Sequence, residues 1–84
     1  MEKGTIMIES SVKNDERFMA ELVQLANRFS SAIHFTFEDK IINGKSIMGM
    51  MTLMAFSGTK MELIAEGADE KEALEAITAY ILKG

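Results

Sequence analysis

Residues 43–51, Asn-Gly-Lys-Ser-Ile-Met-Gly-Met-Met, join a glycine-containing loop to a short apolar segment through a serine. A serine directly before an apolar run is typical of a helix N-cap, because its hydroxyl accepts a hydrogen bond from one of the first unpaired backbone N–H groups. The sequence therefore predicts a short helix that begins after Ser46 and ends before Ser57-Gly58, where the glycine permits a left-handed turn.

Four methionines follow Ser46 on two faces of this predicted helix. Met48 and Met51 are three residues apart, whereas Met50 and Met54 are four apart, so each pair shares a face. A methionine stripe is most often part of a core. We therefore predict that one pair packs against the core and that the other faces solvent or a partner.

A hydroxyl at a helix start is also a position where a phosphate group is well tolerated. The helix dipole is positive there, free backbone N–H groups are available, and Lys45 adjoins Ser46. Such a site can stabilise the two negative charges, roughly, that a phosphate adds. Ser46 could therefore be phosphorylated without unfolding of the domain, although most serine N-caps are only structural.

Alternating apolar residues predict four strands around this loop and helix. The residues expected to face the core are Ile6 and Ile8 in segment 5–9, Ile33, Phe35 and Phe37 in segment 33–38, and Met61, Leu63 and Ala65 in segment 60–66. A tight turn at Glu38-Asp39 leads from the second segment into a strand at Lys40–Asn43. His34, the only histidine, is expected on the outer face of its strand.

A helical period predicts two longer helices on either side of these strands. The first begins near Asn14 or Asp15, and its apolar stripe consists of Phe18, Met19, Leu22, Val23, Leu25, Ala26 and Phe29. The second begins after Asp69, which is spaced from Glu72 as in a capping box. Its apolar face consists of Ala73, Leu74, Ile77, Tyr80 and Ile81.

The predicted order is therefore strand, helix, strand, strand, short helix, strand, helix. Residues 1–84 suffice for one compact domain and leave no room for a second core. With a hairpin in the middle, these elements favour an α+β fold, in which a four-stranded antiparallel sheet carries three helices on one face.

Composition excludes several classes of function. Nine Lys and Arg against thirteen Asp and Glu give a net charge of −4, which disfavours direct nucleic acid binding. The lack of cysteine excludes disulfides and thiolate metal sites, and we expect no metal and no cofactor. No apolar run approaches the ~20 residues of a membrane span, and Glu2-Lys3 lead directly into an alternating segment, unlike a signal peptide. We therefore expect a cytoplasmic protein with no membrane partner.

Three motifs occur in order along the chain: 23–29 (Val-Gln-Leu-Ala-Asn-Arg-Phe), 45–49 (Lys-Ser-Ile-Met-Gly) and 65–74 (Ala-Glu-Gly-Ala-Asp-Glu-Lys-Glu-Ala-Leu). Together they resemble the phosphocarrier protein HPr of the sugar phosphotransferase system in its Gram-positive form. The similarity runs at nearly gapless spacing from Val23 to Tyr80 and more weakly to the N-terminus. The resemblance implies an open-faced β-sandwich. The elements of this fold follow one another in the order that the periodicity predicts.

The family's carrier motif is changed in this sequence. HPr proteins have Gly-Leu/Ile-His-Ala-Arg-Pro-Ala before the first helix, and the histidine passes phosphate from Enzyme I to sugar-specific IIA proteins. The resemblance places Asp15 at that histidine and Phe18 at the proline, while Arg17 is retained. Imidazole suits phosphoryl relay because it is a nucleophile when neutral and a good leaving group when phosphorylated. A lone carboxylate does not replace it, so we interpret Asp15 as an anion that stabilises the start of its helix.

The resemblance therefore implies a regulatory protein similar to the Crh-like members of the family, which lack the carrier histidine and keep the regulatory serine. Such a protein is a substrate and a signal, not an enzyme. HPr kinase/phosphorylase would phosphorylate Ser46 with ATP, and the phosphoprotein would bind a transcriptional regulator such as the catabolite control protein CcpA. The family's docking surface corresponds to Arg17, Ala20, Ile47, Met48 and Met51.

Two other functions stay open at this point. One is phosphocarrier activity through an unusual acceptor, Asp15 or His34. The other is that of a protein-binding module whose Ser46 is never modified. A further hypothesis concerns Asp15, whose carboxylate beside Arg17 would partly imitate a phosphorylated histidine, since it supplies one charge where phosphate supplies nearly two.

Overall fold

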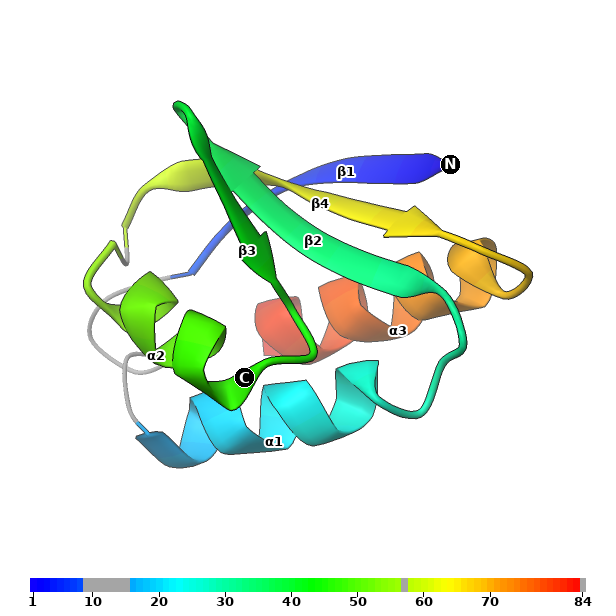
Figure 1. The fold of residues 1–84 in the computed structure, drawn as a ribbon, viewed down its shortest axis with the longest axis horizontal. Coiled ribbons are helices and arrows are strands. Elements are labelled where there is room, and N and C mark those ends of the chain that lie inside the picture. Colours follow the sequence, from blue (N-terminus) through cyan, green and yellow to red (C-terminus); the bar gives the residue numbers. More distant parts are fainter. Residues whose placement is uncertain (9–15, 57, 84) are drawn as a thin grey trace.

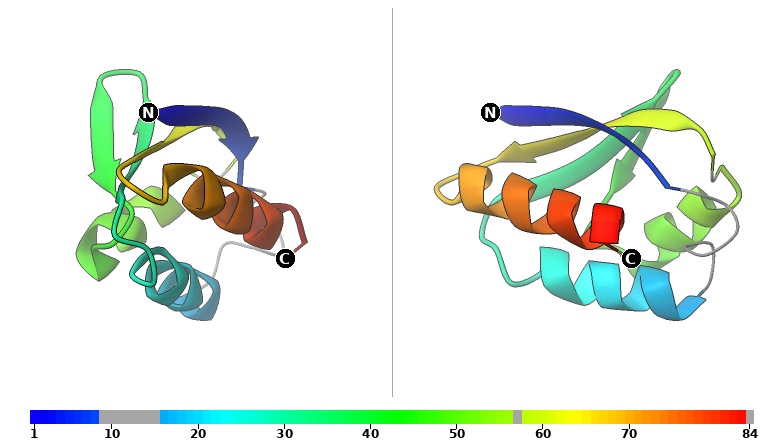
Figure 2. Two further views of the ribbon diagram at one scale, coloured as in Figure 1. Left: turned by 90° about the vertical axis from the view of Figure 1, so that its right-hand side faces the viewer. Right: turned by 180° about the vertical axis from the view of Figure 1, so that it is seen from behind.

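The computed structural model describes residues 1–8, 16–56 and 58–83. The elements are β1 (Glu2–Met7), α1 (Glu16–Ala26), β2 (Ala32–Phe37), β3 (Lys40–Asn43), α2 (Ile47–Met54), β4 (Lys60–Glu66) and α3 (Glu70–Lys83). The strands form one layer and the three helices form a second layer on one face of it (Figures 1 and 2). This arrangement confirms the predicted α+β fold and the predicted order of its elements.

The sheet has the strand order β1-β4-β2-β3, and all of its pairs are antiparallel. In β1, Glu2 lies opposite Ala65 and Met7 lies opposite Lys60 of β4. The sequence placed the first strand at residues 5–9, whereas β1 already begins at Glu2 because β4 is long enough to pair with it there. β1 and β3 are therefore the edge strands of the sheet, and β4 and β2 are its central strands.

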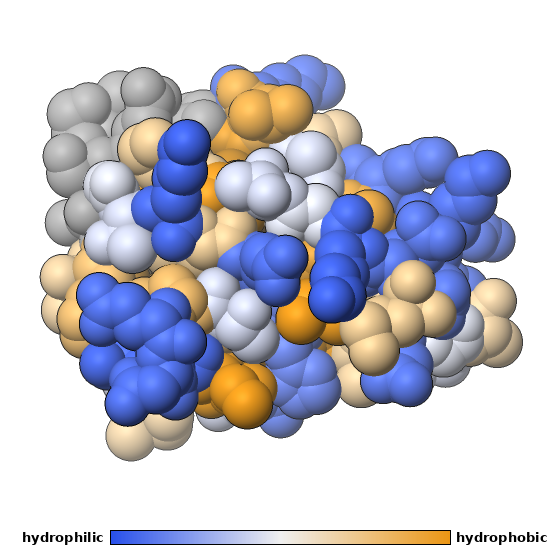
Figure 3. All heavy atoms as spheres, turned by 90° about the horizontal axis from the view of Figure 1, so that it is seen from above, coloured by the Kyte–Doolittle hydropathy of each residue, from blue (hydrophilic) through white to orange (hydrophobic). Residues whose placement is uncertain are grey.

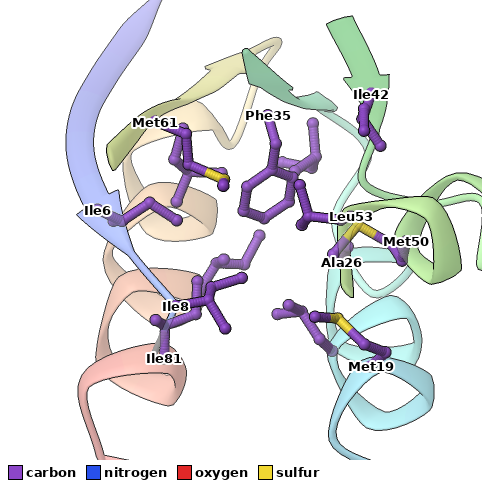
Figure 4. Packing of buried hydrophobic residues seen from close by; sticks show 14 of the residues in the cluster. Ile6, Ile8, Met19, Ala26, Phe35, Ile42, Met50, Leu53, Met61 and Ile81 are labelled. Carbon is purple, nitrogen blue, oxygen red and sulfur yellow. The ribbon is translucent and has the colours of Figure 1, made fainter. Parts of the chain in front are cut away.

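The inward-facing residues of the strands pack against the apolar faces of the helices in one core. Figure 4 shows side chains from both layers pointing toward Phe35, which is completely buried. The inward residues predicted for the strands are buried, and so are the central residues of the predicted helix faces: Phe18, Met19, Leu22 and Ala26 in α1, Met50 in α2, and Ala73, Ile77 and Ile81 in α3. The core also contains Ile42 of β3 and Leu53 of α2, which the sequence did not single out. The hydrophobic periodicity therefore predicted most of the core.

In the described part of the chain, all three helices lie on one face of the sheet, and none covers the other face. It carries the alternate residues of each strand, among them the half-buried His34 and the exposed Ile41. Hydrophilic and hydrophobic side chains are interspersed on this face (Figure 3). The turn between β2 and β3 falls at Glu38-Asp39, as predicted, and Glu38 adopts a positive φ of 54° that glycine would adopt more readily.

The start of α3 differs from the predicted capping box. The carboxylate of Asp69 accepts hydrogen bonds from the backbone N–H groups of Ser30 and Ser31, both at 2.9 Å, and from the buried hydroxyl of Ser31. Gly67 donates its N–H to Glu70 Oε1 at 3.1 Å. Asp69 thus connects α3 to the loop between α1 and β2, and these bonds, the Ser31 hydroxyl first, lower its pKa to about 2.

Candidate functional site

Ser46 is the N-cap of α2, as the sequence predicts. Its backbone is extended, with φ −103° and ψ 121°, and its Oγ accepts the N–H of Gly49 at 3.2 Å. Its carbonyl accepts the N–H of Met50 at 2.9 Å, the first bond of the helix. The hydroxyl is half-buried and lies where the unpaired N–H groups of α2 point.

The loop that leads into Ser46 is built on Asn43, a role that the sequence analysis did not assign. The Asn43 side-chain oxygen accepts the N–H of Lys45 at 2.9 Å, and its carbonyl accepts the N–H of Ser46 at 3.1 Å. An asparagine followed by glycine is a common turn signal for this reason. The Asn-Gly pair at 43–44 was therefore the signal that could have identified this contact in advance.

Two glycines let this loop approach the sheet closely. A Cβ on Gly44 would lie 2.7 Å from Cγ2 of Ile33, and the N–H of Gly44 donates to the Ile33 carbonyl at 2.8 Å. A Cβ on Gly49 would lie 3.3 Å from the Asn43 carbonyl oxygen. Ser46 is therefore held between two close backbone contacts with β2 and β3.

The side chain of Lys45 contacts the chain that follows α1. Its Nζ donates to the carbonyl of Phe29 at 2.6 Å, just beyond the end of α1. In return, Asn27 donates its Nδ2 to the Lys45 carbonyl at 3.2 Å. A cation is favourable at this end of a helix because the dipole is negative there. The loop before α2 is thus fastened to the C-terminal end of α1.

The residues of the expected docking surface lie on two helices that pack against each other, α1 and α2 (Figure 1). On α2, 41% of Ile47 and 77% of Met48 is exposed, while Met51 is half-buried. On α1, Arg17 is exposed and Ala20 is half-buried. All five are thus at least partly accessible. The structure describes α1 only from residue 16, so Asp15 lies outside the described residues.

The methionines of α2 divide between core and surface as their spacing predicts. Met50 is fully buried and Met54 is partly buried against the core. Met48 is the more exposed member of the other pair, followed by Met51. One face of α2 therefore completes the core, and the other presents thioether side chains beside Ser46.

Among the described residues, the histidine lies away from the helix layer, and the acidic side chains form no group that could hold a metal ion. His34 lies on the outer face of the sheet, opposite Asn43 of β3 and Ile64 of β4, as predicted. Among residues 1–8, 16–56 and 58–83, no group of three or more His, Cys, Asp or Glu side chains is placed to hold a metal ion. Within the same part of the chain, no helix is both long and apolar enough to cross a membrane.

The fold and this serine-capped helix define an HPr-like open-faced β-sandwich. A family model described as the HPr component phosphorylation site of the phosphotransferase system matches residues 3–83. The chain belongs to the HPr family. Members of this family are phosphocarrier-like proteins that act with other proteins of the phosphotransferase system or of regulation, and are not themselves enzymes.

The similar proteins include both HPr-like proteins named Crh and phosphocarrier proteins named HPr. The chain is 50% identical over 62 residues to the HPr-like protein Crh of Bacillus subtilis, covering 74% of this chain and 73% of that protein. It is 42% identical over 81 residues to the phosphocarrier protein HPr of Neisseria meningitidis serogroup A, covering 96% and 91%. The crystal structure of HPr-C-His from Thermoanaerobacter tengcongensis superimposes with a TM-score of 0.88 at 40% identity, covering 99% of this chain and 93% of that one.

Proposed function

We propose that this chain is an HPr-like regulatory protein without the carrier histidine, which HPr kinase/phosphorylase phosphorylates on Ser46. The phosphoprotein then docks on a regulator of carbon catabolite control, of the CcpA type. The observation that carries the proposal is the position of Ser46, an accessible helix N-cap directly followed by the exposed apolar residues Ile47 and Met48. The similarity to Crh over 74% of the chain supports the same branch of the family.

Phosphorylation at this position is compatible with the fold. The Ser46 oxygen would attack the γ-phosphorus of ATP, its proton would pass to the kinase, and ADP would leave. The new phosphate would occupy the positive end of α2, where Gly49 already donates its N–H to the serine oxygen. We assign the stabilisation first to the backbone N–H groups of α2. The Lys45 ammonium donates to the Phe29 carbonyl and retains two further N–H donors.

The surroundings of Ser46 suit a small docking surface. Ile47 and Met48 supply exposed apolar area on α2, and Arg17 supplies a guanidinium group on α1. Methionine and arginine are enriched in protein–protein interfaces, and arginine is frequent among the residues that contribute most of the binding energy. The phosphate would add a charge that a complementary basic site on the regulator can recognise.

A kinase assay tests the first step. Incubation with HPr kinase/phosphorylase and ATP should add one phosphate, seen as a gain in intact mass. Ser46→Ala should abolish the gain, whereas Thr52→Ala, which removes an exposed hydroxyl from the same helix, should not. The phosphorylated wild type should then retain a CcpA-type regulator in a pull-down that the unmodified protein does not. A chain that gains no phosphate would instead be an unmodified binding module.

A relay assay tests the second step, the absence of carrier activity. The chain has one histidine, His34, and it lies on the outer face of the sheet. We therefore expect no phosphate on the protein after incubation with phosphoenolpyruvate and Enzyme I. An acid-labile phosphate on His34, or a hydroxylamine-sensitive one on Asp15, would contradict the proposal and favour an unusual phosphocarrier.

A further inference from the structure

The sulfur redox chemistry of this chain is restricted to thioethers, because the sequence has eight methionines and no cysteine. Oxidation of methionine depends on access of the oxidant to the sulfur. The eight methionines span the whole range of exposure: Met1 is 63% and Met7 42% exposed, and Met51 and Met54 are half-buried. Met19 and Met50 are 0% exposed and Met61 is 3% exposed, whereas Met48 is 77% exposed.

The most exposed of these thioethers lies on the docking surface of the proposed function. Met48 is in the first turn of α2, two residues after Ser46, and it adjoins Ile47. Met50, two residues further on, points into the core next to Leu53 (Figure 4). A change confined to the Met48 sulfur would therefore alter the docking surface and leave the core intact.

We propose that Met48 is a reversible oxidation site, at which hydrogen peroxide or a hypohalous acid forms methionine sulfoxide and weakens docking of the phosphoprotein. With peroxide, a lone pair of the sulfur attacks one oxygen, the S–O bond forms and the O–O bond breaks. The released hydroxide takes up the remaining proton and leaves as water, so the sulfur is oxidised by two electrons and the peroxide is reduced. The regulatory part of this proposal rests on the proposed function.

The expected effect on docking follows from the polarity of the product. A sulfoxide is a polar group with a strong acceptor oxygen, and an apolar pocket on a partner offers it no donor. The Ser46 hydroxyl and its N-cap bond are untouched by the reaction. Phosphorylation of Ser46 and oxidation of Met48, two residues apart, would thus have opposite effects on docking.

A peptide map tests the site itself. The whole chain, with and without phosphate on Ser46, is treated with dilute hydrogen peroxide and digested, and each methionine is scored by mass spectrometry. Met48 should be oxidised early, whereas Met19, Met50 and Met61 should react at least about tenfold more slowly, because their sulfurs become accessible only when the structure opens. In concentrated urea this difference should disappear. Oxidation of Met48 at the rate of the buried methionines in the native protein would overturn the proposal.

A binding measurement tests the consequence. Peroxide treatment of the phosphoprotein should raise its Kd for the CcpA-type regulator about tenfold, as for loss of a central apolar contact, and methionine sulfoxide reductase should restore the affinity. Met48→Leu keeps a similar apolar volume but has no sulfur at this position. Its own Kd is measured before and after treatment, and the change should be much smaller than in the wild type. Equal loss of affinity in the wild type and in Met48→Leu would overturn the regulatory role. Failure of the untreated phosphoprotein to bind would overturn the docking function, whereas the peptide map decides the oxidation site independently.

Discussion

The contact of the Lys45 ammonium group with the Phe29 carbonyl gives this residue a structural role. The sequence places a cation beside Ser46, which suggests direct neutralisation of a phosphate. In the structure its Nζ instead lies 2.6 Å from the Phe29 carbonyl oxygen, and Asn27 bonds the Lys45 carbonyl. Lys45 therefore fixes the loop to α1. A phosphate on Ser46 would meet the N-terminal N–H groups of α2, while Lys45 uses one of its three N–H donors for the bond to Phe29.

Gly44 gives a prediction at the scale of one side chain. Gly44→Ala would place a Cβ 2.7 Å from Cγ2 of Ile33 and 3.0 Å from Cε1 of Phe35, both in the core layer. We expect a loss of about 1–3 kcal/mol in the free energy of unfolding, since well-packed surroundings must shift. Urea denaturation followed by circular dichroism measures it.

Gly4→Ala is the matched control for that substitution. Its Cβ would lie 3.9 Å from the nearest atoms of Leu74, which is an ordinary van der Waals contact. The free energy of unfolding should therefore change little, or rise, because alanine is less costly than glycine in a strand. Equal destabilisation by the two variants would mean that the close approach at Gly44 is not what constrains this position.

At the scale of elements, hydrophobic periodicity was enough to locate most of the fold. The bounds predicted for β3 and β4 are those observed, and Ser46 starts α2 as predicted. These successes share a cause, because alternation, helical spacing and caps are all local properties of the sequence. The two faces of α2 followed from methionine spacing alone.

The contacts that the sequence did not predict are those between distant segments. Asp69 looked like a helix cap because Glu72 follows at the right spacing, yet its carboxylate bonds Ser30 and Ser31, 39 and 38 residues away. Neither partner has a local signal that points to the other. The same holds for Lys45 and Phe29, 16 residues apart. The expected surface residues of α1 and α2 are accessible, and their role in docking stays a prediction.

The N-cap of α2 gives a prediction at this scale. Ser46→Ala removes the acceptor of the Gly49 N–H and should lower the free energy of unfolding by about 0.5–2 kcal/mol. Ser46→Asp should retain most of the stability that the cap contributes, since aspartate is a good N-cap and its charge suits the helix dipole. Chemical denaturation with an unchanged m-value checks both. Thr52→Ala should stay within about 0.5 kcal/mol of the wild type, and a larger loss there than in Ser46→Ala would contradict the role of the cap.

At the scale of the whole molecule, Asp69 joins the loop before β2 to α3 and makes stability depend on pH. Its pKa is lowered from the ordinary value to about 2, first by the Ser31 hydroxyl and then by the Ser30 N–H. A carboxyl with a lowered pKa contributes stability above its unfolded pKa, and this contribution is lost as the pH falls through the folded one. We therefore expect the wild type to lose stability between about pH 4 and pH 2.

Asp69→Asn tests this dependence. The variant should be less stable than the wild type at pH 7, and the difference between the two should shrink as the pH falls from 4 to 2. Thermal unfolding across this range measures it. Asp39→Asn makes the same change of carboxylate to amide in the exposed turn between β2 and β3. It is the control and should stay within about 0.5 kcal/mol of the wild type at pH 7. A constant difference between Asp69→Asn and the wild type at every pH would show that the carboxylate charge is not responsible.

The strand order has a consequence for synthesis on the ribosome. Among the four described strands, β1 pairs only with β4, and β4 is the last of the four to be made. In a nascent chain that ends before residue 60, the β2–β3 hairpin is the one part of the sheet that can form. β1 has no strand to pair with until β4 is made. Closure of the domain is therefore a late event in translation, and the loop that carries Ser46 emerges before the sheet beneath it exists.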